Sequence, residues 1–128
     1  MKRESAAYLD KARDLLERAP ALLAQQFTDE AGRAAYFAGF HAAQAFIFEK
    51  THRSLKTLSG VQAEFARLAK SEPSIDDRLR AFLGRAYNLK ALADYETGAG
   101  SKVSHFQAVE AIEAGRSFVA TLEKLIGP

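Results

Sequence analysis

The chain has 128 residues, of which 48% are hydrophobic and 27% are charged, and it contains no cysteine. A single domain of this length can bury a hydrophobic core without disulfides, and the absence of thiols excludes a disulfide framework and thiolate chemistry. The formal net charge is +2 at pH 7. Proteins that coat nucleic acids have a larger excess of basic residues, so the composition does not indicate that class.

Apolar residues at helical spacing predict a first helix from about Ser5 to Gln26. Charged residues interrupt this segment every few positions, so it offers no apolar run for export or for spanning a membrane. We therefore expect a cytoplasmic protein with no membrane association. Pro20 lies inside the predicted helix, where its ring and missing amide should cost about 3 kcal/mol. A kink or a short break is expected there.

The second predicted helix, Asp29 to Lys50, is expected to be the central helix of a bundle. Its large aromatic residues are Tyr36, Phe37, Phe40, Phe46 and Phe48. The side opposite its main aromatic face carries the small residues Ala35, Ala38, Gly39, Ala42 and Ala43. A helix that is apolar on nearly all sides is usually buried. We expect this helix to have more apolar surface than three neighbouring helices can easily cover. Ala34 is expected nearer the start and edge of the helix, and Thr28 is the expected N-cap residue.

Two further helices follow. Ser59 with Gln62 forms a capping-box pattern, which predicts a short helix from Gly60 to about Lys70. Ser74 with Asp77 marks the start of a fourth helix, which should run to about Glu96 before the glycines that follow it.

Ser104 with Gln107 is another capping-box pattern and predicts the start of the last helix. Its expected buried stripe comprises Phe106, Val109, Ile112, Ala114, Phe118, Leu122 and Leu125. No strand-like alternation and no domain linker interrupt the chain. The predicted fold is therefore all-α, a single domain over residues 1–128 with an antiparallel up-and-down four-helix bundle and an additional short helix.

No metal site or cofactor is expected from the pattern of ligating residues. Glu49 and His52 have the Glu-x-x-His spacing of di-iron bundles, but the chain has no second copy of that motif. His41, His52 and His105 form no paired zinc motif. The stretch from Gly98 to Gly100 lacks the lysine and hydroxyl residue of a phosphate-binding loop.

Four segments in series resemble the HEPN domain family, whose members are small prokaryotic helical bundles named for a proposed link to nucleotide binding. They are AAYFAGFHAAQAFIFEK (34–50), LSGVQAEFARLA (58–69), LKALADYETG (89–98) and VSHFQAVEAIEAGRSFV (103–119). The resemblance implies a four-helix bundle that is often a homodimer. It also implies a frequent pairing with a minimal nucleotidyltransferase as toxin and antitoxin. Many members resemble metal-independent ribonucleases, which carry an arginine, four to six intervening residues and a histidine.

The chain departs from this ribonuclease motif. Arg33 precedes His41 by too many residues, and no arginine stands four to six residues ahead of His52 or His105. Lys90 occupies a position where the family commonly has arginine, and a leucine stands where it commonly has histidine. The general acid or base of RNA cleavage therefore has no obvious candidate.

The family's Arg-x-x-Ala-Asp-Tyr site suggests a set of candidate ligand-binding residues. Lys90, Asp94 and Tyr95, with Arg85 one to two turns earlier, could form a polar cleft. Lysine in place of arginine would keep the charge but lose the planar fork that binds phosphate bidentately. Alternatively, Lys90 and Asp94 form a partly buried ion pair that fixes helix packing. His41 likewise has two interpretations, a ligand contact or a hydrogen-bonded core or interface histidine.

The connection Thr51 to Leu58 is the most basic short stretch in the chain. It contains His52, Arg53 and Lys56 and no acidic residue, which makes it a candidate phosphate-binding segment, although three charges in a loop are more often solvated surface.

These patterns predict a non-catalytic HEPN-like module that binds a protein partner or a nucleotide. A homodimer is expected, and a minimal nucleotidyltransferase, a nucleotide or RNA are the candidate partners. Small residues on the second side of the central helix would suit close packing, within the bundle or across a two-fold interface. The alternative is a divergent metal-independent ribonuclease toxin with its site around Arg85, Lys90, Asp94 and Tyr95.

Overall fold

The computed structural model describes residues 1–128 and consists of five α-helices with no strand. The helices are α1 (Arg3–Ala24), α2 (Thr28–Thr51), α3 (Leu58–Ala69), α4 (Asp77–Tyr95) and α5 (His105–Ile126). The predicted all-α bundle with one short extra helix is confirmed.

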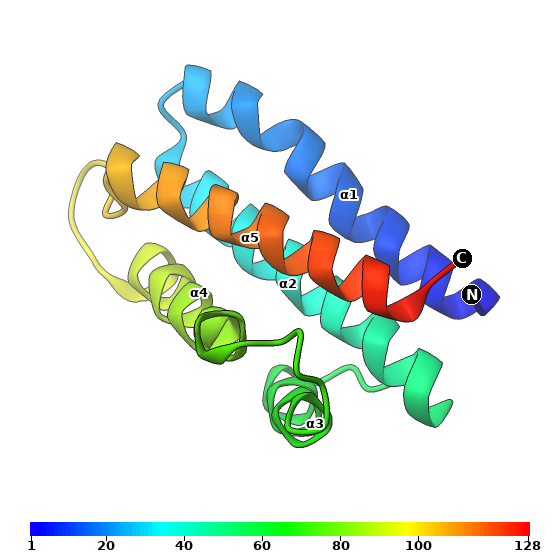
Figure 1. Ribbon diagram of the computed structural model, residues 1–128. Helices are drawn as coiled ribbons and strands as arrows, with labels where there is room; N and C mark the ends of the chain where they lie inside the picture. Colours follow the sequence, from blue (N-terminus) through cyan, green and yellow to red (C-terminus); the bar gives the residue numbers. More distant parts are fainter.

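The four long helices alternate in direction along the chain (Figure 1). α2 and α5 lie against each other in the centre, with α1 on one side of this pair and α4 on the other. α3 packs near the C-terminal end of α2. The two chain ends lie together (Figure 1), where the Met1 ammonium group donates a hydrogen bond to the Pro128 carbonyl.

α2 is the central element, as its composition predicts. It contacts all four other helices, and 16 of its 24 residues are buried. Its apolar surface is thus covered within one copy of the chain. Four helices, rather than the three considered from the sequence, cover α2, so its apolar surface provides no argument for association.

α1 continues through Pro20 without the expected break. Proline has no amide to donate to the carbonyl four residues earlier, which belongs to Leu16. That carbonyl accepts a hydrogen bond from Arg116 Nη2 of α5 at 3.4 Å instead. A tertiary contact therefore replaces the missing helical bond.

The starts of α2 and α3 differ from the predicted caps by one or two residues. Phe27 occupies the N-cap position of α2, and Thr28 lies inside the helix without a side-chain cap bond. α3 is capped by Thr57, whose hydroxyl accepts from the Gly60 amide at 3.0 Å, rather than by Ser59. Because the Thr57 hydroxyl accepts from an amide three residues later in the chain, α3 begins at Leu58, two residues before the predicted start at Gly60.

The caps of the last two helices follow the same physical rule. Asp76, not Ser74, caps α4, and its carboxylate accepts from the Leu79 amide at 2.9 Å. The capping box of Ser104 and Gln107 at the start of α5 is confirmed, with both reciprocal bonds present.

The burial of two side chains differs from the prediction. Phe106, predicted to be buried, is 71% exposed, whereas Ala34, predicted near an edge, is 6% exposed. Phe106 is in the first turn of α5, on the helix face that carries the exposed Glu110 and Glu113, whereas Ala108 in the same turn is buried.

Candidate functional site

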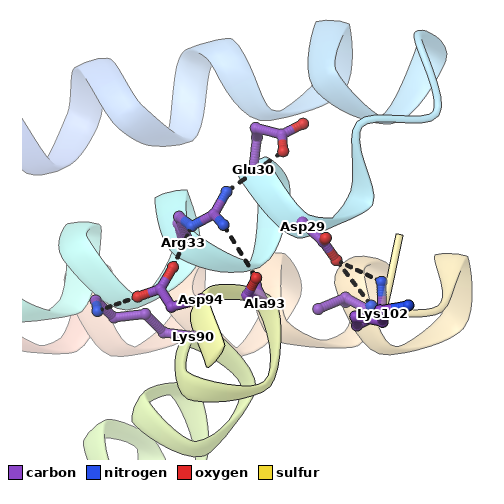
Figure 2. A network of polar contacts seen from close by, with 8 residues as sticks. Asp29, Glu30, Arg33, Lys90, Ala93, Asp94 and Lys102 are labelled. Carbon is purple, nitrogen blue, oxygen red and sulfur yellow. Dashed lines mark hydrogen bonds and ion pairs between the residues drawn. The ribbon is translucent and has the colours of Figure 1, made fainter. Parts of the chain in front are cut away.

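Asp94 is held between two cations at the C-terminal end of α4 (Figure 2). Lys90 Nζ lies 2.5 Å from Asp94 Oδ2, and Arg33 Nε lies 2.5 Å from Asp94 Oδ1. The side chains of Lys90 and Asp94 are only 13% and 21% exposed. Hydrogen bonds from Lys90 and then Arg33 hold the pKa of Asp94 below its ordinary value. We refer to these three residues as the Arg33–Lys90–Asp94 cluster.

Local structure explains how the cluster forms. Lys90 and Asp94 are four residues apart on α4 and therefore share one helix face. Arg33 reaches them from the start of α2, and its Nη2 donates to the Ala93 carbonyl at 3.2 Å. That carbonyl is among the last four of α4, which have no partner within the helix. Arg33 also pairs with Glu30 at 3.3 Å, and its own pKa is raised, chiefly by its hydrogen bond to Asp94.

The loop after α4 is fixed to the same end of α2 (Figure 2). Asp29 Oδ1 accepts from the backbone amides of Lys102 at 2.9 Å and Val103 at 2.8 Å. Val103 is buried. The carboxylate in the first turn of α2 thus satisfies two loop amides and holds the α4–α5 connection in place.

A half-buried stripe continues from the cluster along α2. Arg33, Phe37 and His41 follow one another at four-residue spacing, so they lie on one face of the helix. Lys90 Nζ lies 5.7 Å from the centre of the Phe37 ring, and the rings of Phe37 and His41 are 6.5 Å apart. A cation, an aromatic ring and an imidazole are therefore neighbours on this face.

The His41 ring has a defined hydrogen bond. Gln44 Nε2 donates to the Leu55 carbonyl at 2.7 Å, which leaves Gln44 Oε1 to accept from His41 Nδ1 at 2.8 Å. Burial lowers the pKa of His41 below its ordinary value. This arrangement fits the interpretation of His41 as a hydrogen-bonded histidine that ties α2 to the following loop.

The four residues of the suggested polar cleft do not all meet. Arg85 precedes Lys90 by five residues, which turns it by roughly 140° around the helix axis, and it lines a groove between α4 and α5. Tyr95 is 72% exposed and its hydroxyl makes no hydrogen bond. The structure brings Lys90 and Asp94 together with Arg33, a partner that sequence spacing did not indicate.

The basic connection is not a cluster of free charges. Arg53 Nη1 pairs with Glu64 Oε2 at 3.3 Å, and Glu64, whose side chain is 9% exposed, also binds Arg67. His52 is the left-handed C-cap of α2, with a φ of 60°. Lys56 is exposed and makes no ion pair. Of the predicted phosphate-binding residues, Arg53 is therefore ion-paired, whereas His52 and Lys56 are separate exposed side chains.

The described motifs and the helical bundle agree with the comparison against protein families. The HEPN domain model matches residues 5–125, nearly the whole chain. The chain belongs to the HEPN domain family. No curated protein matches it.

Within this HEPN domain, the three histidines lie at three different places. His41 is hydrogen-bonded in the middle of α2, His52 ends α2, and His105 begins α5. No group of three or more histidine, aspartate or glutamate side chains is arranged to hold a metal ion. None of the helices has the length and hydropathy needed to cross a membrane.

Proposed function

We propose that this HEPN domain is a non-catalytic module that acts by binding another macromolecule. The observation that carries the proposal is the Arg33–Lys90–Asp94 cluster, in which a single carboxylate engages both cations. A phosphate group would have to compete with Asp94 for each of them. The cluster joins the start of α2 to the end of α4, as a packing interaction would.

The cluster also lacks the groups that RNA cleavage needs. Metal-independent cleavage requires one group to take the 2′-hydroxyl proton and another to protonate the leaving oxygen. The lowered pKa of Asp94 keeps it ionised and weakens it as a base near neutral pH. The imidazole nearest the cluster along α2, His41, already donates to Gln44.

The proposed partners are a second copy of this chain and a minimal nucleotidyltransferase, in a cytoplasmic toxin and antitoxin pair. Where a nucleotidyltransferase gene adjoins the gene for this protein, co-expression tests the second partner. The proposal expects the two products to elute together in size-exclusion chromatography. Separate elution of two folded proteins would exclude the nucleotidyltransferase as a partner.

Nucleotide binding is a second candidate function, and the stripe of Arg33, Phe37 and His41 favours it. A base could stack on the Phe37 ring while the cations of the cluster take a phosphate in exchange for Asp94. The test is thermal melting of the wild type and of Lys90→Ala/Asp94→Ala with and without a nucleoside triphosphate. A rise in the melting temperature of the wild type alone would establish this site.

The remaining alternative is a divergent ribonuclease. RNA cleavage without metal by the wild type, abolished in Lys90→Ala/Asp94→Ala, would favour it over the binding module.

A further inference from the structure

Cations gather at the end of the bundle where α1 begins, α2 ends and α3 packs (Figure 1). They come from three segments that are distant in sequence: the start of α1, the connection after α2 and the last turn of α3. We call this surface the basic end, and it comprises Lys2, Arg3, His52, Arg53, Arg67 and Lys70.

The cations of α1 adjoin the connection after α2. Lys2 Nζ donates to the Glu49 carbonyl at 2.9 Å and to its carboxylate at 3.3 Å, which fixes the start of α1 to the last turn of α2. Arg3 and His52 line one shallow pocket at this junction. Arg3 is exposed and makes no ion pair. Since His52 precedes Arg53, the surface continues into the connection.

Glu64 joins the connection to α3. Its carboxylate binds Arg53 Nη1 at 3.3 Å and accepts from Arg67 Nε at 2.6 Å and Nη2 at 3.1 Å. Lys70 follows Arg67 by three residues, so the two side chains are neighbours on α3. Lys70 is exposed and makes no ion pair. The basic end is therefore continuous from α1 to α3.

The carboxylates of this region lie beneath the cations. The side chains of Glu49 and Glu64 are 18% and 9% exposed, whereas those of Arg53 and Arg67 are 63% and 64% exposed. The outer layer is therefore positive. Arg53 uses only Nη1 to bind Glu64, so its Nε and Nη2 atoms have no partner. This edge of a guanidinium group can hold a carboxylate through two parallel hydrogen bonds.

We propose that the basic end docks an acidic segment of a partner protein. One carboxylate of the partner accepts from Nε and Nη2 of Arg53, and further carboxylates of the same segment approach Arg3 and Lys70. Docking here rests on the proposed binding function and deepens it, because it gives the surface and the chemistry of the partner.

Two observations favour an acidic protein over a nucleic acid. Proteins that bind single strands stack bases on exposed aromatic residues, but Phe27, Tyr95 and Phe106 are exposed at the opposite end of the bundle (Figure 1). A continuous run of phosphates would also pass over Glu4, an exposed carboxylate that lines the same pocket as Arg3. A protein places its carboxylates at separate positions and can avoid this repulsion.

Fluorescence anisotropy with a labelled synthetic peptide of glutamate, aspartate and glycine tests this surface. The wild type should bind the peptide, and added salt should weaken binding because exposed charges are screened. Arg3→Glu/Lys70→Glu should weaken binding by at least about tenfold. Arg53→Lys should weaken it by about threefold, because lysine keeps the charge but lacks the planar fork. Glu4→Lys should tighten binding, because it removes the exposed carboxylate.

Arg18→Glu/Arg85→Glu is the matched control, because both positions are exposed, unpaired and outside the basic end, and the net charge changes equally. This control should bind the peptide within about twofold of the wild type. Circular dichroism checks that every variant is folded. A labelled single-stranded RNA of the same length is measured alongside the peptide.

No binding of the peptide to the wild type at about 1 mM would overturn the proposal. An equal loss in the control variant, or tighter binding of the RNA than of the peptide, would also overturn it. Each of these failures leaves the non-catalytic binding function standing, because RNA cleavage and co-elution with the nucleotidyltransferase test that function separately.

Discussion

Gly39 lies at the closest approach between α2 and α4, and adding a single methyl group there should disturb the packing. A Cβ atom at this position would lie 2.4 Å from Phe82 Cε2 and 3.2 Å from Leu83 Cδ2. The Phe82 ring cannot easily move aside, because it stacks on Phe118 with ring centres 4.8 Å apart. Gly39→Ala is therefore an overpacking substitution in the core.

The expected magnitude is a difference between two opposing effects. Alanine in a helix interior gains about 0.5–1 kcal/mol over glycine, whereas overpacking a well-packed core costs typically 1–3 kcal/mol. Gly39→Ala should thus reduce the free energy of unfolding by about 1 kcal/mol, a fall of roughly 3–5 °C in melting temperature for a domain of this size. Gly39→Leu adds three more carbons and should be considerably worse.

Two other helical glycines serve as controls in the same thermal melts. A Cβ atom at Gly84 meets nothing within 4 Å, and one at Gly115 comes no closer than 3.6 Å to another atom. Gly84→Ala should raise the melting temperature, and Gly115→Ala should be near neutral or stabilising. An increase for Gly39→Ala as large as that for Gly84→Ala would refute the packing argument. Ala34 is no suitable control on α2, because its side chain is only 6% exposed.

Two further outcomes are expected. The backbone amide of Lys2 donates to Glu49 and lowers the pKa of Glu49 from 4.5 to about 2. This stabilisation is present above the ordinary pKa and is lost as the pH falls from 4.5 towards 2, so acid should destabilise the wild type more than Glu49→Gln in melts across that range. Arg116→Met should lower the free energy of unfolding by about 1 kcal/mol, because it leaves a carbonyl of α1 without its partner. Pro20→Ala restores an amide that can donate to the Leu16 carbonyl, so Arg116→Met should lower the free energy of unfolding by less in that background. Equal losses in both backgrounds would show that Pro20 and Arg116 are not coupled.

Helix number, order and the central place of α2 follow from sequence because they depend on local patterns. Apolar spacing and capping residues act within a few positions, and the aromatic residues of one segment identify the buried helix. The capping box at Ser104 is a case where the local rule suffices. Thr57 lies two residues before Ser59, and Asp76 lies two residues after Ser74. Local rules did not decide which residue of each pair caps the helix.

The parts that sequence did not reveal depend on contacts between distant residues. Nothing in the spacing links Arg33 to Asp94, and the hydrogen bond that Arg116 offers to α1 near Pro20 arises only in the folded bundle. Phe106 fits the apolar stripe of its helix by periodicity, yet in the folded bundle it lies on the exposed face of α5 with Glu110 and Glu113. Arg85 and Lys90 are close in sequence but point to different faces of α4. The HEPN resemblance supplied the family, whereas the grouping of these side chains required the fold.

The claim that this HEPN domain binds without catalysing a reaction is tested most directly by incubating a labelled single-stranded RNA with an excess of the wild-type protein, in a buffer with a metal chelator. We expect no more than trace cleavage, equal to that of Lys90→Ala/Asp94→Ala, because Phe37 separates His41 from the Arg33–Lys90–Asp94 cluster and the His41 imidazole is already hydrogen-bonded to Gln44. Clear cleavage by the wild type that the double variant abolishes would contradict it and make the cluster a nuclease site.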